Sequence, residues 1–220
     1  MISDDACTLC QNGQTIQHVL SFCKPALVSG RFTWRHNTVL KPVADYVRSL
    51  LPPSVIIHVD DLPEYKYDQP FLHTVHTTTL RPDIVLVEAK SKTFVMIELS
   101  CPDDENMNQR RTFKQKKYEP LVQNATANHW KTQLHTIEIS TRGFHNGSLR
   151  RTLSAIGSQW KHPPTKTDIS AMCSITSELC LHASYFIWLC RNITSFPCPP
   201  TLTPSRSLPK PCPGHAGRGR

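Results

Sequence analysis

Two apolar segments separated by four residues constrain the fold of this chain more than any other feature of its sequence. They cover residues 80–88 and 93–100, with Ala89-Lys90-Ser91-Lys92 between them. Both are short and rich in β-branched residues, so they predict two strands joined by a tight connection. Apolar side chains fall on both faces of each strand, which indicates a pair covered on both sides.

The flanking segments place this pair in an α/β domain. Strands are expected over 54–59 and 134–140, and helices over 37–51, from about 102 to 122, 148–160 and 169–191, with a long polar connection over 60–79. Pro52-Pro53 ends the first helix, because proline cannot continue it. This order of elements predicts a mixed sheet with helices on both faces.

Composition separates the end of the chain from the rest. Residues 194–220 hold seven of the 18 prolines and four basic residues without an acidic one, which is half of the net charge of +8. Such a segment buries too little apolar surface to order itself, so we expect a disordered basic tail. The predicted organisation is a small zinc-binding segment, or zinc knuckle, over 1–30, an α/β domain over 31–193 and the tail over 194–220.

The acidic opening MISDDACTLC fits no signal peptide, and no apolar run approaches bilayer length, so we expect an intracellular chain without a membrane partner. The positive net charge favours an anionic partner such as nucleic acid.

Two carboxylates occupy opposed positions of the predicted strand pair. If the connection is centred between Lys90 and Ser91, Asp83 lies opposite Glu98 and the two share a face. Like charges at such positions are destabilising, so a counter-charge is expected. Magnesium or manganese, which prefer oxygen ligands, would supply it. The same register places Arg81 opposite Ser100.

The following helix carries basic residues at intervals of three, namely Arg111, Lys114 and Lys117, next to Tyr118. We expect Arg111 and Tyr118 to contact nucleic acid. A metal ion beside a cation is the arrangement that phosphodiester cleavage requires. The alternative is that Asp83 ends a turn, Glu98 pairs with a surface arginine, and the basic residues form a solvated helix face.

The N-terminus carries a second candidate metal site, with the spacing Cys7-x2-Cys10-x7-His18-x4-Cys23. Three thiolates and an imidazole can close a tetrahedral zinc site, although four free residues on a flexible end are the alternative. Arg31, Trp34 and Arg35 follow it, and they suit base stacking and phosphate contact unless Trp34 is a core anchor. His36, His58, His73 and His76 are assigned no role.

The combined pattern resembles the restriction-like endonuclease of site-specific non-LTR retrotransposons, in the PD-(D/E)xK superfamily, where a CCHC knuckle precedes the nuclease. The motifs are Arg81-Pro82-Asp83, Glu98-Leu99-Ser100-Cys101-Pro102 and Arg111-x-x-Lys114-x-x-Lys117-Tyr118. The resemblance implies a restriction-endonuclease-like core in which Asp83, Glu98 and the Leu99 carbonyl bind magnesium. Ser100 stands where the family has its catalytic lysine, so Lys114 or, preferably, Lys117 would replace it, with Arg111 on the DNA backbone.

The implied function is a nuclear, magnesium-dependent DNA endonuclease, active or degenerate, that nicks target DNA for target-primed reverse transcription. A complete element carries a reverse transcriptase before the knuckle, for which 220 residues leave no room, so a fragment or remnant is expected. The alternative is a non-catalytic binder of DNA or RNA that uses the knuckle and basic surfaces. A structure-selective nuclease akin to junction resolvases would share the metal chemistry.

Overall fold

A four-stranded mixed sheet forms the centre of the molecule. The computed structural model describes residues 6–60, 62 and 78–193. Its strands are β1 (Ile56–Val59), β2 (Ile84–Glu88), β3 (Thr93–Ser100) and β4 (Lys131–Glu138), in that spatial order. β2 is antiparallel to both β1 and β3, whereas β3 and β4 are parallel. The predicted mixed sheet is therefore confirmed.

The register of the central strands is the one that the sequence predicts. Ile84 pairs with Ile97, and Glu88 pairs with Thr93 across the connection 89–92. β2 begins at Ile84, so Arg81 precedes the ladder and does not face Ser100 as expected. Its Nε donates instead to Oδ1 of Asp60 at 3.1 Å.

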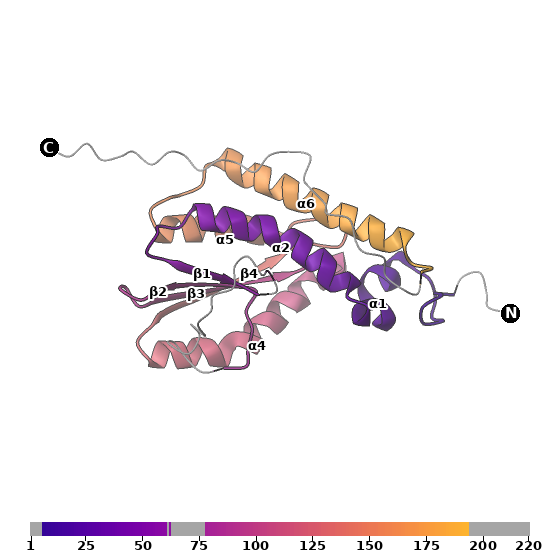
Figure 1. The fold of residues 1–220 in the computed structure, drawn as a ribbon, viewed down its shortest axis with the longest axis horizontal. Coiled ribbons are helices and arrows are strands. Elements are labelled where there is room, and N and C mark those ends of the chain that lie inside the picture. Colours follow the sequence, from indigo (N-terminus) through magenta and orange to yellow (C-terminus); the bar gives the residue numbers. More distant parts are fainter. Residues whose placement is uncertain (1–5, 61, 63–77, 194–220) are drawn as a thin grey trace.

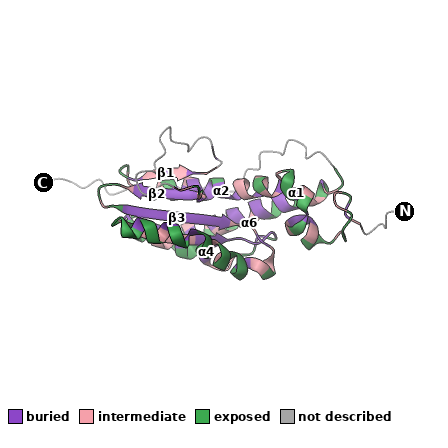
Figure 2. Cartoon of the chain, turned by 90° about the horizontal axis from the view of Figure 1, so that it is seen from below, coloured by how far each residue is buried: buried purple, intermediate pink, exposed green. Residues whose placement is uncertain are grey.

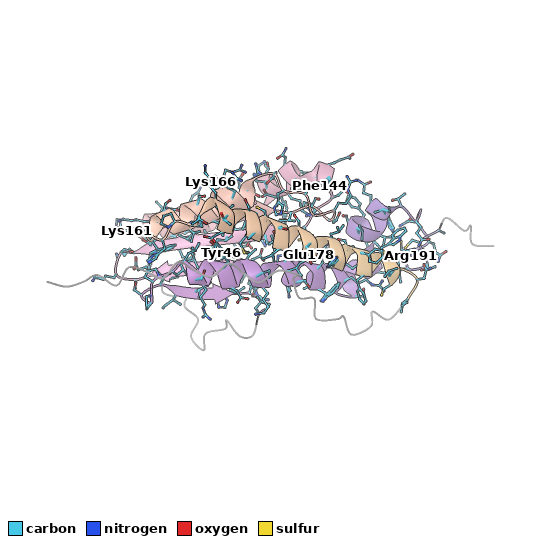
Figure 3. The ribbon with its side chains drawn as sticks, turned by 90° about the horizontal axis from the view of Figure 1, so that it is seen from above. Tyr46, Phe144, Lys161, Lys166, Glu178 and Arg191 are labelled. Carbon is cyan, nitrogen blue, oxygen red and sulfur yellow. The ribbon has the colours of Figure 1, made fainter. Side chains whose placement is uncertain are left out.

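Helices cover both faces of the sheet (Figure 1). α2 (Arg31–Ser49), α5 (Ser148–Gln159) and α6 (Lys166–Leu189) lie on one side, and α4 (Met107–Ala127) lies on the other. Figure 3 shows α6 beside α2 in the first layer, with Lys166 and Arg191 near its two ends.

Alternate residues of β3 enter two different cores. Val95 and Ile97 join the larger core beneath α2, α5 and α6, while Phe94 and Met96 join the core beneath α4. Figure 2 shows β2 and β3 buried along their length, as strands apolar on both faces must be. Glu98 follows the same alternation, so its carboxylate lies on the α4 side and is fully buried.

Two helices begin earlier than the sequence suggests. α2 starts at Arg31 rather than near residue 37, because Gly30 reverses the chain in the left-handed region at φ 78°. α6 starts at Lys166, where Thr165 accepts a hydrogen bond from the Asp168 N–H at 3.1 Å and the Asp168 carboxylate accepts one from the Thr165 N–H. This capping box fixes the start of the helix.

The N-terminal segment contains a π-helical turn, η1 (His18–Phe22), and α1 (Lys24–Val28). Val19 and Leu20 pack against Ile187 of α6, so the segment is joined to the body of the molecule. Most of the expected connection over 60–79 lies outside the described residues. The expected tail over 194–220 lies entirely outside them. Within the described part, no helix combines the length and hydropathy of a membrane span.

Candidate functional site

Asp83 and Glu98 come together at the end of the sheet through two hydrogen bonds. The Asp83 N–H donates to Glu98 Oε1 at 3.1 Å, and the Leu99 N–H donates to Asp83 Oδ2 at 2.7 Å. Each carboxylate is thus tied to the strand that carries the other. The sequence register predicts this meeting, because the paired positions of β2 and β3 continue from Ile84 and Ile97 to Asp83 and Glu98.

Two cations reach these carboxylates from opposite helical layers. His36 of α2 places Nε2 3.2 Å from Asp83 Oδ2, and Lys114 of α4 forms an ion pair with Glu98 Oε2. Lys117, the lysine that the sequence favours, donates to the Tyr118 hydroxyl at 2.9 Å. The contact with a carboxylate therefore belongs to Lys114, which was the second choice.

His36 is the residue of this cluster that the sequence leaves without a role. It precedes Asp83 by 47 positions and reaches it only because α2 packs over the sheet. An isolated histidine carries no spacing signal that predicts such a contact. The neighbouring apolar positions Val39, Leu40 and Val43 do predict that this helix faces the core.

Burial and neighbouring charged groups together set the charge states of His36, Asp83 and Glu98. Burial disfavours charge on His36, but the Asp83 carboxylate outweighs it and raises the pKa of His36 to about 9. Burial likewise opposes ionisation of Asp83, yet His36 lowers the pKa of that carboxyl. Burial and the charge of Asp83 raise the pKa of Glu98, although Lys114 opposes the rise. Asp83 and His36 therefore form a charged pair at neutral pH.

Glu138 adds a third buried acidic residue beside the cluster. It pairs with Ser100 in the parallel ladder and is fully buried. Its Oε2 accepts hydrogen bonds from the Arg111 guanidinium at 3.0 Å and from Asn146 Nδ2 at 3.0 Å. The sequence gives Arg111 a role on the DNA backbone, whereas here it anchors the start of α4 to β4.

The other candidate nucleic-acid contacts lie mostly in the interior. Arg31 is 1% exposed and donates to the Cys190 carbonyl at 2.8 Å. Arg35 is 2% exposed and donates to the Leu20 and Cys101 carbonyls at 2.9 and 3.2 Å. Trp34 packs edge-on against Phe186, with ring centroids 5.3 Å apart, as the core-anchor alternative predicts. Arg31 and Arg35 are too deeply buried for the expected contact with nucleic acid, whereas for the partly exposed Trp34 that contact stays a prediction.

Tyr118 is also buried, and its hydroxyl donates to the Arg81 carbonyl at 2.8 Å. Burial raises the pKa of this phenol, so it remains protonated. Because Tyr118 is fully buried, it supports Asp83 and Glu98 from the α4 side and is not exposed for the contact with nucleic acid that the sequence predicts.

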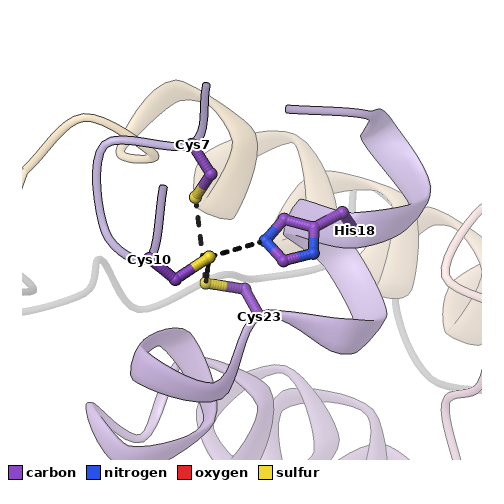
Figure 4. A group of neighbouring side chains, drawn as sticks. All are labelled: Cys7, Cys10, His18 and Cys23. Atoms are coloured by element: carbon purple, nitrogen blue, oxygen red, sulfur yellow. Dashed lines mark hydrogen bonds between the residues drawn. The ribbon is translucent and has the colours of Figure 1, made fainter. Parts of the chain in front are cut away.

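The four predicted zinc ligands converge at the N-terminus (Figure 4). Their ligand atoms all lie within 4.8 Å of one another. Cys7 Sγ is 3.9 Å and Cys10 Sγ 4.0 Å from Cys23 Sγ. A tetrahedral ion with Zn–S bonds of about 2.3 Å would separate its sulfurs by about 3.8 Å. A metal ion such as zinc can therefore be held by the four side chains of Cys7, Cys10, His18 and Cys23.

Local backbone geometry explains this convergence. The N–H groups of Cys10 and Gln11 both donate to the Cys7 carbonyl, at 3.2 and 2.7 Å, which folds the first pair of cysteines into a tight turn. The π-helical turn closes with a bond of 2.9 Å from the Cys23 N–H to the His18 carbonyl, bringing the second pair together. Burial raises the pKa of the Cys23 thiol to about 11, so a metal would replace a proton there.

A cleft of about 720 Å³ adjoins both groups of side chains. Cys23 and Lys24 line it from the N-terminal segment, and His36, Leu99 and Lys114 line it from the carboxylate cluster. The cleft therefore lies between the candidate metal site and the residues that contact Asp83 and Glu98, although these two carboxylates do not line it. No family model matches this chain, and no curated protein matches its sequence. The fold and site define a mixed α/β protein with a cluster of three cysteines and one histidine.

Proposed function

We propose that the chain is a metal-dependent DNA endonuclease domain of the restriction-like type found in site-specific non-LTR retrotransposons. The observation that supports it best is the meeting of Asp83 and Glu98 with Lys114 on the second carboxylate. An acidic pair with an adjacent lysine is the constellation that hydrolysis of a phosphodiester needs. Lys114, the partner of Glu98, also lines the open cleft through which a DNA strand would approach the pair.

Asp83, Glu98 and the Leu99 carbonyl would hold Mg²⁺ or Mn²⁺. Two carboxylates beside a main-chain oxygen fit the hard-oxygen preference of these ions. A bound ion would supply an activated water and neutralise charge on the phosphate. His36 holds Asp83 in its ionised form, and Lys114 can move its ammonium group from Glu98 Oε2 to the scissile phosphate or the attacking water.

Cys7, Cys10, His18 and Cys23 would form a structural zinc knuckle. Four protein ligands close the coordination sphere, so no position is left for catalysis. The metal would instead fix the turn that leads into α1, and Cys23 and Lys24 on this turn line the cleft. In a complete element such a domain would work in the nucleus beside a reverse transcriptase and expose a 3′ hydroxyl on target DNA.

Nicking of supercoiled plasmid with Mg²⁺ or Mn²⁺ tests the proposal. Glu98→Gln should abolish nicking, while Glu119→Gln, the same change at an exposed position of α4, should not. Lys114→Met should reduce the rate much more than Lys117→Met, because among the described residues Lys114 contacts a carboxylate and Lys117 contacts the Tyr118 hydroxyl. Plasmid nicking by Glu98→Gln at the wild-type rate would reject the assignment.

A non-catalytic nucleic-acid binder is the second candidate. It is favoured by the pairing of Asp83 with His36 and of Glu98 with Lys114, which already neutralises both carboxylates without a metal ion. Such a protein would bind DNA or RNA with an affinity that falls steeply with salt, at a logarithmic slope of about −0.9 per phosphate contacted on duplex DNA. It would not nick plasmid with either ion.

A further inference from the structure

The cleft has walls from two segments that are distant in the sequence. One wall comes from η1, α1 and the first turns of α2, and the other from the first turns of α4, with the end of β3 and the segment after it between them. Figure 1 shows α1 at the same end of the molecule as the start of α4. The residues that give the cleft its chemistry are Phe22, Lys24, Leu27, Arg110, Phe113 and Lys114.

Two phenylalanines present their rings to this cleft instead of to a core. Both residues line the cleft and remain accessible to solvent, since Phe22 is 51% exposed and Phe113 is 56% exposed. Exposed aromatic rings are platforms on which nucleobases stack, with a gain of about 1–3 kcal/mol per base. A base inside a duplex is already paired and stacked, so only an unpaired base can use such a ring.

The charges of the cleft complement a phosphate backbone. Lys24, Arg110 and Lys114 bring positive charge to its walls, while Asp103 is the acidic residue among those that line it. The Asp103 carboxylate accepts a hydrogen bond of 2.8 Å from Gln17 Nε2. Positive groups interleaved with aromatic rings are the combination that binds single strands, and it disfavours an apolar peptide as the occupant.

We infer that the cleft binds an unpaired segment of DNA, with a base stacked on Phe22 or Phe113 and phosphates on Lys24, Arg110 and Lys114. Its volume is in the range that encloses ligands of about nucleotide size. The inference rests on the proposed nuclease function and specifies its substrate. Lys114 lines the cleft and pairs with Glu98, so a strand in the cleft would place a phosphate at the lysine that contacts this carboxylate.

Fluorescence anisotropy with one added equivalent of zinc and no other divalent cation tests this inference. The probes are a short labelled single-stranded DNA, its blunt duplex and an RNA of the same sequence. We expect single-stranded DNA to bind most tightly, and Phe113→Ala and Phe22→Ala each to weaken that binding by about tenfold, as the loss of one stacked base requires. Tyr185→Ala, an aromatic residue 61% exposed on α6, should bind as wild type does.

The outcomes separate this inference from the nuclease proposal. Tighter binding of the duplex or of RNA, or wild-type affinity in both phenylalanine variants, would overturn the inference even if the protein nicks plasmid. Phenylalanine-dependent binding of single-stranded DNA by a protein that never nicks would support the inference and reject the nuclease.

Discussion

The ion pair between His36 and Asp83 gives the stability of the domain a defined pH dependence. The folded protein holds the pKa of His36 at about 9, against an ordinary value of 6.5. This difference corresponds to roughly 3 kcal/mol of free energy of unfolding. Solvent screens part of it, because the His36 and Asp83 side chains are 23% and 14% exposed, so we expect about 2 kcal/mol.

The sign follows from the direction of the shift. A raised pKa means that the folded state holds the proton more tightly than the unfolded chain. The contribution is therefore complete below pH 6.5 and disappears as pH rises through about 9. His36→Gln removes the charge but retains a group that can donate a hydrogen bond to Asp83.

Urea unfolding of wild type and His36→Gln, with zinc bound and without magnesium, measures this effect. The difference in free energy of unfolding should shrink by about 2 kcal/mol between pH 6.5 and values above 9. His182→Gln, at an exposed position of α6, should track wild type throughout. A difference between wild type and His36→Gln that stays constant over this range would refute the ion pair.

Two further predictions concern the candidate zinc site and the start of α4. Native mass spectrometry should detect one equivalent of zinc on wild type, which Cys23→Ser should lose and Cys173→Ser should retain. Arg111→Ala should lower the free energy of unfolding by roughly 2–3 kcal/mol, because it leaves the buried Glu138 carboxylate without its cation. Adding Glu138→Gln to Arg111→Ala should recover part of that loss in the same urea titration.

Local patterns in the sequence predict the hairpin of β2 and β3 and the convergence of the four candidate zinc ligands. Alternation of apolar residues over 84–88 and 93–97, with a short connection, leaves one register that buries both faces. That register predicts the meeting of Asp83 and Glu98 as well. The ligands of the cluster lie within residues 7–23, so their spacing alone predicts that they can converge.

Local patterns do not predict which residues that are distant in the sequence come into contact in the fold. His36 and Glu138 reach the site only through the packing of α2 and the parallel pairing of β4 with β3. Arg31 and Arg35 look like surface cations in the sequence, yet they donate to carbonyls of α6, η1 and the segment after β3. Long side chains of arginine can satisfy buried main-chain groups, and a composition-based argument cannot distinguish this use from phosphate binding.

The central claim is that Asp83 and Glu98 share a divalent cation, and manganese binding followed by electron paramagnetic resonance tests it most directly. The protein is first loaded with zinc, so that the cysteine cluster does not take up manganese. We expect wild type and Glu119→Gln to bind one Mn²⁺ that Glu98→Gln and Asp83→Asn do not bind. Equal manganese binding by all four proteins, or by none, would contradict the shared site.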